Sequence, residues 1–361
     1  MKLAIVYDWI DSWGGAERIL STLFDLYPAA DIYTLYADYR KAVWAKKYSN
    51  RIKTTFLQSW YNLVPHKQFL APFMPYAIES LNLSAYDVVL SISSAFAKGV
   101  LTRPETKHIS YIFAPTRFLW HEKERYTNHG YIAGIVKWLQ DWDKIASKRP
   151  DKILTLSKHT QHLLSTIYYL PSTVVYPPFD MDYYENLKRN SKKPSISLPQ
   201  NYFLFVGRLE PYKRIDLLTD AFSKMPHQNL VIIGSGSELP KIRKSISNFN
   251  NITVYSNLSD FELAYVYRHA TALLMPQSED FGYTALESVF FKTPVMSYAK
   301  SGVAEFVRNK GNGILFSEQT ASEIVKQVEK FRVSDYNMDT SVVEMFSKKK
   351  FITKIKQQIS N

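Results

Sequence analysis

Two carboxylate residues, Glu279 and Glu287, lie eight positions apart in a segment that we expect to change from a loop to a helix near Gly282. A helical rise of about 1.5 Å per residue would separate the two acids by about 12 Å and by about 80° around the axis. That span fits a nucleotide-sugar, because the first acid can meet sugar hydroxyls and the second the ribose. The free amides at the junction Phe281-Gly282-Tyr283 would then face the diphosphate. The alternative is a capped surface helix with solvated acids.

A second segment carries positive charge. An apolar, strand-like run over 203–206 ends on Gly207, and a cationic turn with Arg208 and Lys213 follows it before an amphipathic stretch over 215–222. The two cations are therefore expected at the carboxyl end of a strand, where open α/β sheets bind ligands. Arg can bind two phosphate oxygens at once, and Lys acts as a point charge. The alternative is a solvated turn with scattered charges.

These segments belong to a series of seven short motifs whose order resembles that of the retaining glycosyltransferases of family 4. The motifs are Gly14–Arg18, Tyr176–Asp180, Gly207–Asp216, Ile233–Gly236, Glu279–Glu287, Thr293–Val295 and Ser301–Val307. Each match is short, but seven in order along nearly the whole chain are specific. The Glu-Asp-Phe-Gly and Pro-Tyr-Lys-Arg-Ile-Asp forms are most similar to the bacterial O-antigen mannosyltransferase branch.

The resemblance implies an α/β chain with the GT-B fold, in which two Rossmann-like domains face each other across a cleft. An N-terminal acceptor domain would span 1–180, with a C-terminal helix over 345–361 packing back on it. A C-terminal domain for the nucleotide-sugar donor would span 181–344.

The resemblance also implies roles for individual residues. Arg208 and Lys213 would hold the donor diphosphate and Glu279 would contact the transferred sugar, so these three form the expected catalytic set. Glu287 would bind the ribose hydroxyls. Gly14-Gly15 would let a backbone loop close over the pyrophosphate, because these residues lack side chains. A simple β–α turn is the other interpretation of the two glycines.

The chain departs from the family pattern at two positions. Phe113 stands where many members carry His, so any role of that His near the reacting sugar is not transferred to this chain. Ser301-Gly302 stands where many relatives have paired glycines, which leaves the donor-sugar contacts of that loop unassigned.

The activity implied by the resemblance is retaining transfer of a hexose to a hydroxyl of a lipid-linked or cell-surface glycan, with formation of an α-linkage, as in bacterial polysaccharide and lipopolysaccharide biosynthesis. GDP-mannose is the first choice of donor, and UDP-hexoses are the alternative. The leaving diphosphate could itself take the acceptor proton, so no protein nucleophile is required, and neither a metal ion nor a further cofactor is expected. The competing classes are a sugar-nucleotide epimerase of similar fold and a non-enzymatic basic protein that binds membrane or nucleic acid.

Composition agrees with two globular domains. The 361 residues are 46% hydrophobic, which supplies apolar surface for two cores. The absence of cysteine excludes disulfides, thiolate nucleophiles and zinc–thiolate sites. The opening apolar run over 3–7 is too short for a signal peptide and predicts a buried strand, and no apolar run approaches the roughly 20 residues that span a bilayer. We expect a cytoplasmic protein that associates peripherally with the inner face of the cell membrane.

The net charge of +12 is unevenly distributed. Residues 39–78 contain no acid, and basic residues that include Lys46, Lys47 and Arg51 alternate there with aromatic residues that include Trp60. This composition suits an anionic membrane surface, where each cation contributes about 1 kcal/mol, and we expect the segment to meet a lipid-linked acceptor. Nucleic acid is disfavoured, because no nucleic-acid-binding motif accompanies the segment. A solvated basic face around an aromatic cluster is the remaining alternative.

Three other signals are weak. Gly234-Ser235-Gly236 begins like a dinucleotide-binding fingerprint, but Leu239 stands where a third small residue is needed. Asp180-Met181-Asp182 imitates a metal-binding acid pair but is expected to be a solvated loop. Four histidines have no ligand spacing: His108, His121, His159 and His269.

The strand pattern predicts two parallel sheets separated by a charged, proline-containing linker over 182–200. Strands of the first sheet are expected over 3–7, 88–92, 108–113, 152–156 and 173–176. Strands of the second sheet are expected over 202–206, 230–233, 253–255, 272–275, 295–298 and 313–316.

Overall fold

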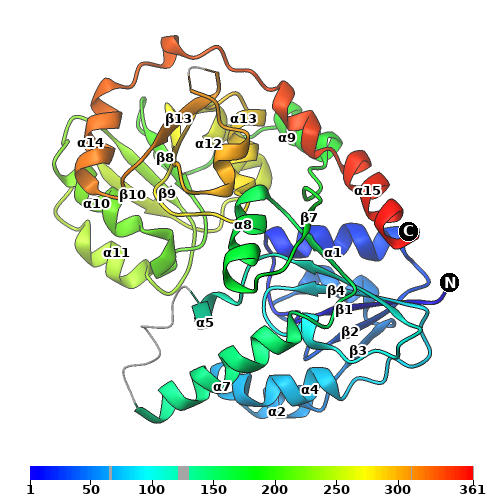
Figure 1. Cartoon of the computed structure of the whole chain (residues 1–361). Coiled ribbons are helices and arrows are strands. Elements are labelled where there is room, and N and C mark those ends of the chain that lie inside the picture. Colours follow the sequence, from blue (N-terminus) through cyan, green and yellow to red (C-terminus); the bar gives the residue numbers. More distant parts are fainter. Residues whose placement is uncertain (65–66, 121–129, 310, 361) are drawn as a thin grey trace. The chain divides into compact units, whose positions relative to one another are not determined.

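The computed structural model describes residues 1–64, 67–120, 130–309 and 311–360, and it divides into two compact units (Figure 1). The first unit consists of Met1–Pro178 with Lys349–Asn361, and the second of Phe179–Lys348. Each unit is built around one parallel sheet covered by helices, so the α/β class expected from the sequence is confirmed. The acceptor and donor roles expected for the two parts of the chain stay predictions. His121 lies outside the described residues.

The sheet of the first unit has the strand order β3-β2-β1-β4-β5-β6-β7, and neighbouring strands pair in parallel. Its strands are β1 (Leu3–Tyr7), β2 (Asp31–Thr34), β3 (Ile52–Thr54), β4 (Val88–Ser93), β5 (Lys107–Ile112), β6 (Lys152–Thr155) and β7 (Thr173–Val174). The central strands β1 and β4 are buried along their whole length, which is why β1 is a continuous apolar run and the polar residues of β4 are two small serines. The strand order reverses direction between β1 and β4.

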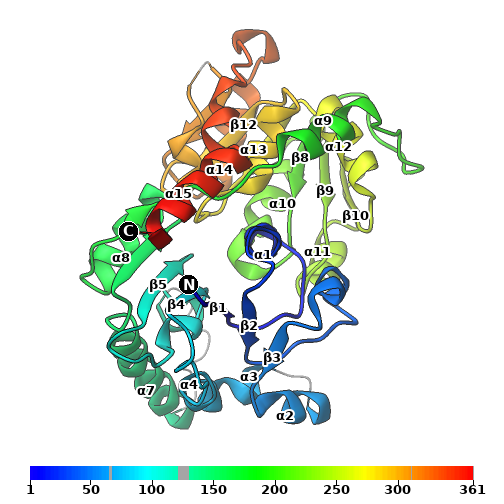
Figure 2. The ribbon, with the colours of Figure 1, turned by 90° about the vertical axis from the view of Figure 1, so that its right-hand side faces the viewer.

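Helices cover both faces of this sheet. They are α1 (Gly15–Leu26), α2 (Leu57–Leu63), α3 (Lys67–Leu70), α4 (Met74–Glu79), α5 (Arg117–Trp120), α7 (Gly130–Ala146), α8 (Lys158–Ile167) and α15 (Lys348–Ser360), with 3₁₀ turns η1 (Val43–Tyr48), η2 (Ala71–Phe73) and η3 (Ala97–Gly99). Figure 2 shows α2, α4 and α7 on one face and α1 and α15 on the other. Ala4, Val6 and Val89 form a core with the helices of the first of these faces.

The C-terminal helix α15 packs on the first unit through one apolar stripe. Phe351, Ile355 and Ile359 are buried and recur every four residues, which places them on one side of the helix. The Nζ of Lys107 on β5 donates to the carbonyl oxygens of Gln358 and Ile359, both at 3.3 Å. These bonds satisfy carbonyls that have no partner within the last helical turn.

The sheet of the second unit has the order β10-β9-β8-β11-β12-β13 and is also parallel. Its strands are β8 (Phe203–Val206), β9 (Leu230–Ile233), β10 (Ile252–Tyr255), β11 (Ala272–Met275), β12 (Val295–Tyr298) and β13 (Gly313–Phe316). Its helices are α9 (Met181–Arg189), α10 (Ile215–Ser223), α11 (Leu239–Ser245), α12 (Asp260–His269), α13 (Tyr283–Phe290) and α14 (Ala321–Lys330), with 3₁₀ turns η4 (Pro211–Lys213), η5 (Gly302–Glu305), η6 (Val333–Asp335) and η7 (Ser341–Phe346).

The predicted strands are confirmed, those of the second sheet to within one residue. Two strands of the first unit, β2 and β3, were not predicted, because each is short and includes exposed or half-buried polar residues. The predicted linker is wrong in its first half, where α9 forms. The carboxylate of Asp180 caps this helix by accepting from the amide of Tyr183 at 3.2 Å, so it does not lie in a simple solvated loop. Tyr184 and Leu187 bury one side of the helix, while its charged residues face solvent.

A buried histidine lies in the first sheet. His108 on β5 is inaccessible to solvent, and its Nε2 is 2.9 Å from the hydroxyl of Ser91 on β4. Burial disfavours the charged imidazolium and lowers the pKa of His108 to about 4.

This burial predicts a pH dependence of stability. In the unfolded chain His108 has the ordinary pKa of about 6.5 and binds its proton first, so the unfolded state gains protons between about pH 6.5 and pH 4. The neutral histidine therefore contributes stability that is present above about pH 6.5 and is lost as the pH falls, by roughly 2–3 kcal/mol near pH 4. Urea unfolding from pH 7 to pH 4 should show this loss in the wild type and a smaller one in His108→Gln. Equal pH dependences in the two proteins would contradict it.

Candidate functional site

Four loops of the second unit meet at the carboxyl ends of its parallel strands. They follow β8, β9, β11 and β12, and the strand order changes direction between β8 and its neighbours β9 and β11. A change of this kind opens a crevice in which α/β folds bind ligands. The cationic turn follows β8 and the acidic loop follows β11, so the fold brings both sequence motifs to this edge.

The loops after β8 and β9 are in backbone contact. A Cβ atom on Gly234 would lie 1.9 Å from the carbonyl oxygen of Gly207, and one on Gly236 would lie 2.4 Å from that of Leu209. The glycines that imitate a dinucleotide fingerprint are therefore required for close packing of the cationic turn against its neighbour.

The loops after β11 and β12 are packed in the same way. A Cβ atom on Gly302 would lie 2.2 Å from the carbonyl oxygen of Asp280. Gly282 precedes α13 with a φ of +90°, and a Cβ there would lie 2.4 Å from a methyl carbon of Val303. The helix thus begins where the sequence predicted, and a glycine is required at that point.

Lys213 and Glu279 form an ion pair across this edge. The Nζ of Lys213 donates to Oε1 of Glu279, and Nε2 of Gln277 donates to the same oxygen at 2.8 Å. Only 13% of the Lys213 side chain and 14% of the Glu279 side chain are exposed, so the pair is partly shielded from water. The structure therefore brings the cation predicted for the diphosphate and the acid predicted for the sugar into direct contact.

Backbone contacts hold Glu279 in place. Its carbonyl oxygen accepts from the amide of Gly302 at 2.7 Å, and its amide donates to the hydroxyl of Ser301 at 3.1 Å. The same hydroxyl accepts from the amide of Val303 at 3.3 Å, which caps η5. Ser301, which stands where relatives have glycine, thus positions the acidic loop. Neither this contact nor that of Gln277 could be predicted from the sequence.

Arg208 lies on the exposed side of the cationic turn. Its Nη2 donates to the hydroxyl of Tyr212 at 2.9 Å, while Nζ of Lys213 lies 5.3 Å from the centre of the Tyr212 ring. Tyr212 therefore contacts both cations of the turn. Arg208 and Lys213 lie on the same turn as predicted, but in this structure Lys213 alone of the two contacts Glu279 among the described residues.

Glu287 is buried among the helices of the second unit. It is 4% exposed, and its carboxylate accepts from the hydroxyl of Tyr184 on α9 at 2.6 Å and from that of Tyr267 on α12 at 3.0 Å. Residues 285–290 of α13 are all buried, whereas Tyr283 and Thr284 in its first turn are half-buried. Glu287 joins three helices, and its contact with a ribose stays a prediction.

The side chains beside Gly282 also differ from each other. Phe281 is 5% exposed and packs against Phe306 and Phe346, with ring centres 5.8 and 5.2 Å away. The ring of Phe281 is therefore covered by other side chains of the second unit. Tyr283 is half-buried and meets the edge of Phe281.

In the first unit, Gly14 and Gly15 lie at the start of α1. Gly14 has a φ of −175°, which is extended backbone open to any residue, so the backbone conformation does not require glycine there. A Cβ on Gly14 would lie 3.3 Å from a carboxylate oxygen of Glu17. Glu17 is buried and accepts from the hydroxyl of Tyr7 at 3.0 Å. Burial, followed by the charge of Glu17, raises the pKa of Tyr7.

Asp8 is a buried acid whose role the sequence did not reveal. It follows β1 directly, is 1% exposed, and its carboxylate accepts from the four successive amides of residues 94–97 at 2.6–2.9 Å. Burial raises the pKa of Asp8, although these amides act in the opposite direction. Asp8 therefore fixes the loop after β4. The sequence signal that could have indicated this role is the position of an acid directly after an apolar strand.

The position of the family histidine is filled by a buried ring. Phe113 is 6% exposed and packs edge-on against Tyr111, with ring centres 5.4 Å apart. Its phenyl group cannot replace the hydrogen-bonding groups of an imidazole.

The predicted membrane or acceptor residues of the segment 39–78 lie in three environments: on η1, on α2, and, for Arg51, at the end of α1. Lys46 and Lys47 lie on η1 and border a pocket with Trp13 and Trp44. Trp60 lies on α2 and is 43% exposed.

Arg51 binds backbone carbonyls of its own unit, and its predicted place on a membrane or acceptor face stays a prediction. Its guanidinium donates to the carbonyl oxygens of Phe24 at 3.0 Å, Tyr27 at 2.9 Å, Pro28 at 3.0 Å and Ala30 at 3.3 Å. Arg51 therefore binds the C-terminal end of α1, where a cation is favourable, and is a structural residue.

Across the described ranges, no cluster of three or more His, Asp or Glu residues could hold a metal ion. None of the helices described is both long enough and apolar enough to cross a membrane.

Comparisons with known proteins agree with this geometry. Residues 187–344, which lie within the second unit, match the family model of glycosyl transferases group 1. The chain is 27% identical over 188 residues to an uncharacterized glycosyltransferase of Methanocaldococcus jannaschii, covering 51% of this chain and 50% of that protein. It is 30% identical over 155 residues to the D-inositol 3-phosphate glycosyltransferase of Mycobacterium tuberculosis, covering 40% of this chain and 32% of that protein. The matches thus span half or less of these relatives.

Solved structures share the fold over the whole chain. HepE of Anabaena, in complex with UDP-glucose, superposes with a TM-score of 0.72 at 15% identity and covers 100% of both chains. The chain has the GT-B fold, with two Rossmann-like domains of parallel strands.

The contacts of Glu287 predict a loss of stability on its removal. Glu287→Ala leaves two tyrosine hydroxyls without this charged acceptor, and we expect the free energy of unfolding to fall by about 2–4 kcal/mol. Denaturant unfolding at neutral pH measures it, with Glu318→Ala as the control, because Glu318 is exposed in the same unit. Equal stabilities of the two variants would show that the carboxylate does not join the helices.

Proposed function

We propose that this protein is a retaining glycosyltransferase that moves a hexose from a nucleotide diphosphate donor to a hydroxyl of a lipid-linked or cell-surface glycan, forming an α-linkage. The observation that carries the proposal is the contact of Lys213 with Glu279 at the carboxyl edge of the second sheet. A cation for a phosphate and an acid for sugar hydroxyls are what a nucleotide-sugar requires within one site. This edge belongs to the segment that matches glycosyl transferases group 1.

The proposed donor is GDP-mannose, with UDP-hexoses as the alternative. Resemblance of the acidic loop and the cationic turn to the O-antigen mannosyltransferases supports the first. The complex of HepE with UDP-glucose supports the second. The base must contact residues outside these two motifs, so neither motif decides between guanine and uracil.

The proposed chemistry depends on charge that develops on the leaving group. As the glycosidic bond breaks, negative charge builds on the diphosphate. Lys213, Arg208 and the amides at the start of α13 would stabilise this charge, and their interaction with it would be stronger in the transition state than in the ground state. The leaving phosphate takes the acceptor proton, so the scheme needs neither a protein nucleophile nor a metal ion. The ion pair with Glu279 orients the ammonium group of Lys213 before the donor arrives.

A panel of GDP- and UDP-sugars tests the proposal directly. A donor at 100 times its dissociation constant should stabilise the folded protein by about 2.7 kcal/mol, which thermal unfolding detects. Release of the free nucleotide diphosphate distinguishes a transferase from a binding protein. Product analysis distinguishes it from an epimerase, since a transferase extends a glycan and an epimerase alters the donor. Stabilisation by no member of the panel would contradict the proposal.

The cationic turn should govern turnover. Lys213→Ala and Arg208→Ala should each lower kcat/KM about a hundredfold, because each removes charge-assisted contacts worth about 1.5–3 kcal/mol. Lys241→Ala is the matched control, because Lys241 is an exposed cation of the same unit, paired with Glu238. Near-normal transfer by a variant lacking both Lys213 and Arg208 would refute the diphosphate assignment.

The two acids should give different kinetic signatures. Glu279→Gln should mainly lower kcat, if its contact with the sugar strengthens in the transition state. Glu287→Gln should mainly weaken donor binding if the acid exchanges a tyrosine for the ribose, and should change stability alone if it only joins helices. Steady-state kinetics and donor titrations separate these outcomes. A Glu279→Gln enzyme with wild-type kcat would refute the sugar assignment.

We further propose that the first unit binds an anionic membrane through an apolar face. Ten large side chains of this face, between 39% and 81% exposed, are Phe56, Trp60, Leu63, Val64, Phe69, Phe73, Tyr76, Ile135, Trp138 and Ile145. Figure 1 and Figure 2 both place α2, α4 and α7 side by side. Trp60 meets the edge of Phe73 at 5.1 Å, and Tyr76 stacks on Trp138 at 6.0 Å, so residues distant in sequence form one surface.

The composition of the apolar face favours a lipid surface as its partner. Aromatic side chains are enriched at the membrane–water interface. The segment 39–78, which supplies most of the face, contains no acid, which suits anionic headgroups. In this proposal the apolar face makes the main contact with the membrane, instead of Arg51 and the lysines of η1.

Vesicle sedimentation tests the membrane proposal. Trp60→Ser with Phe69→Ser should reduce binding to phosphatidylglycerol vesicles at least tenfold, because both rings are exposed and interfacial. Tyr169→Asn is the control, because Tyr169 is 84% exposed elsewhere in the first unit and has a positive φ that Asn tolerates. Equal binding by the double variant and the control would rule out this surface.

A further inference from the structure

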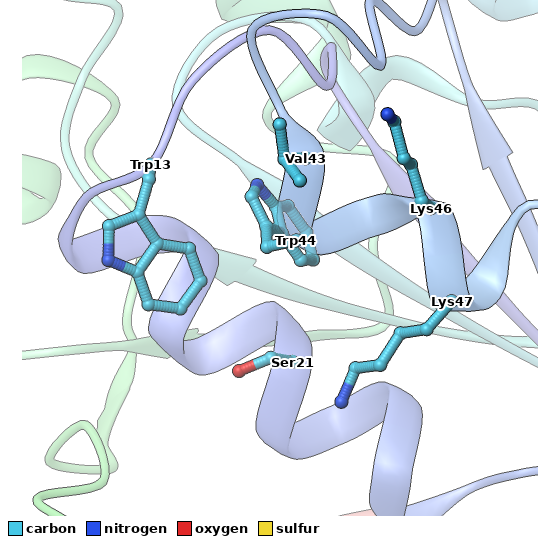
Figure 3. Close-up of a pocket in the computed structure, with 6 residues that line it drawn as sticks. All are labelled: Trp13, Ser21, Val43, Trp44, Lys46 and Lys47. Carbon is cyan, nitrogen blue, oxygen red and sulfur yellow. The ribbon is translucent and has the colours of Figure 1, made fainter.

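A groove in the first unit lies beside the start of α1. Its volume is about 510 Å³, and its lining residues are Trp13, Ser21, Val43, Trp44, Lys46 and Lys47 (Figure 3). The view of Figure 3 shows Trp44 between Trp13 and the two lysines. The groove therefore has an aromatic side and a cationic side.

The aromatic side combines a fixed ring and an exposed one. Nε1 of Trp44 donates to the carbonyl oxygen of Ser12 at 2.7 Å, and the Trp44 ring stacks on Phe24 at 6.2 Å. The Trp13 ring is 5.7 Å away at an angle of 55° and is 53% exposed. A large indole that remains this exposed beside a second one offers a flat surface to a ligand.

The cationic side of the groove carries two lysines, of which one is paired with an acid. Lys47 pairs with Asp25 at 3.4 Å, and both side chains are more than half exposed. Lys46 is exposed as well, and the described part of the chain places no acid within ion-pair distance of it. The two ammonium groups together thus leave a net positive charge at this end of the groove.

We propose that this groove binds a sugar linked to a diphosphate, as the acceptor subsite of the transfer reaction, and this inference rests on the proposed function. One face of a pyranose ring presents polarised C–H bonds, which suit the negative face of an indole, here that of Trp13. Lysine ammonium groups suit phosphate oxygens as point charges, here at Lys46 and Lys47. A lipid-linked acceptor carries both groups next to each other.

Two features argue for an acceptor in this place. Trp13 directly precedes Gly14-Gly15 at the start of α1, so the groove adjoins a backbone segment without side chains. The groove is also formed by α1 and η1, whereas the apolar face is formed by α2, η2, α4 and α7. Contact with lipid and contact with the acceptor sugar are therefore separable by mutation.

The test uses water-soluble acceptors, so that membrane binding does not contribute. The probes are hexosyl and N-acetylhexosaminyl diphosphates on a short isoprenyl chain, with the neutral octyl glycosides of the same sugars for comparison. Calorimetry measures binding and, where the donor turns over, KM is measured as well. Trp13→Ala and Lys46→Ala should each weaken the best diphosphate probe at least tenfold. The control Lys241→Ala should bind it as the wild type does.

The outcomes separate this inference from the proposed function. Binding of no diphosphate probe by the wild type, wild-type affinity in Trp13→Ala, or equal affinity for the neutral glycosides would each overturn the subsite. Binding that depends on Trp13 and Lys46 in a protein that turns over no nucleotide-sugar would uphold the groove as a sugar-diphosphate site and refute the glycosyltransferase.

Discussion

Backbone contact between loops at the carboxyl edge of the second sheet is the constraint on which the site depends. Parallel strands bring the turns after β8, β9, β11 and β12 to one edge, but the turns touch only because Gly234, Gly282 and Gly302 have no side chain. Any Cβ there would overlap a carbonyl oxygen or a methyl group. These glycines pack the cationic turn against the loop after β9 and the acidic loop against the loop after β12. Pairing of β8 with β11 places the two pairs of loops next to each other, and Lys213 contacts Glu279 there.

The ion pair of Lys213 with Glu279 gives the edge a chemical character that its two members would lack separately. A partly shielded cation is more effective than a solvated one at stabilising charge, since less water competes with it. The carboxylate of Glu279 orients that cation at the edge of the sheet. Ser301 and Gln277 fix the acid from its two sides, through its amide and its Oε1 atom. Arg208, which is exposed on Tyr212, would add a second charge from the solvent side.

The sequence predicted most of the fold and one half of the site, for physical reasons that particular residues illustrate. Buried parallel strands are continuous apolar runs, so β1 and β11 were found with their bounds, whereas the short, partly polar β3 was not. Charge type placed Lys213 and Glu279 at one edge. Spacing could not reveal that Glu287 is enclosed by two tyrosines or that Arg51 binds the end of α1, because both depend on elements distant in the chain.

The most direct test of the central claim is an experimental structure of the protein with GDP or UDP, whichever stabilises it more. The account predicts the diphosphate at the carboxyl edge of the second sheet, with a phosphate oxygen within about 4 Å of the Nζ of Lys213 and another near the amides that begin α13. A diphosphate bound elsewhere, with the contact between Lys213 and Glu279 unchanged and no phosphate beside it, would contradict the account.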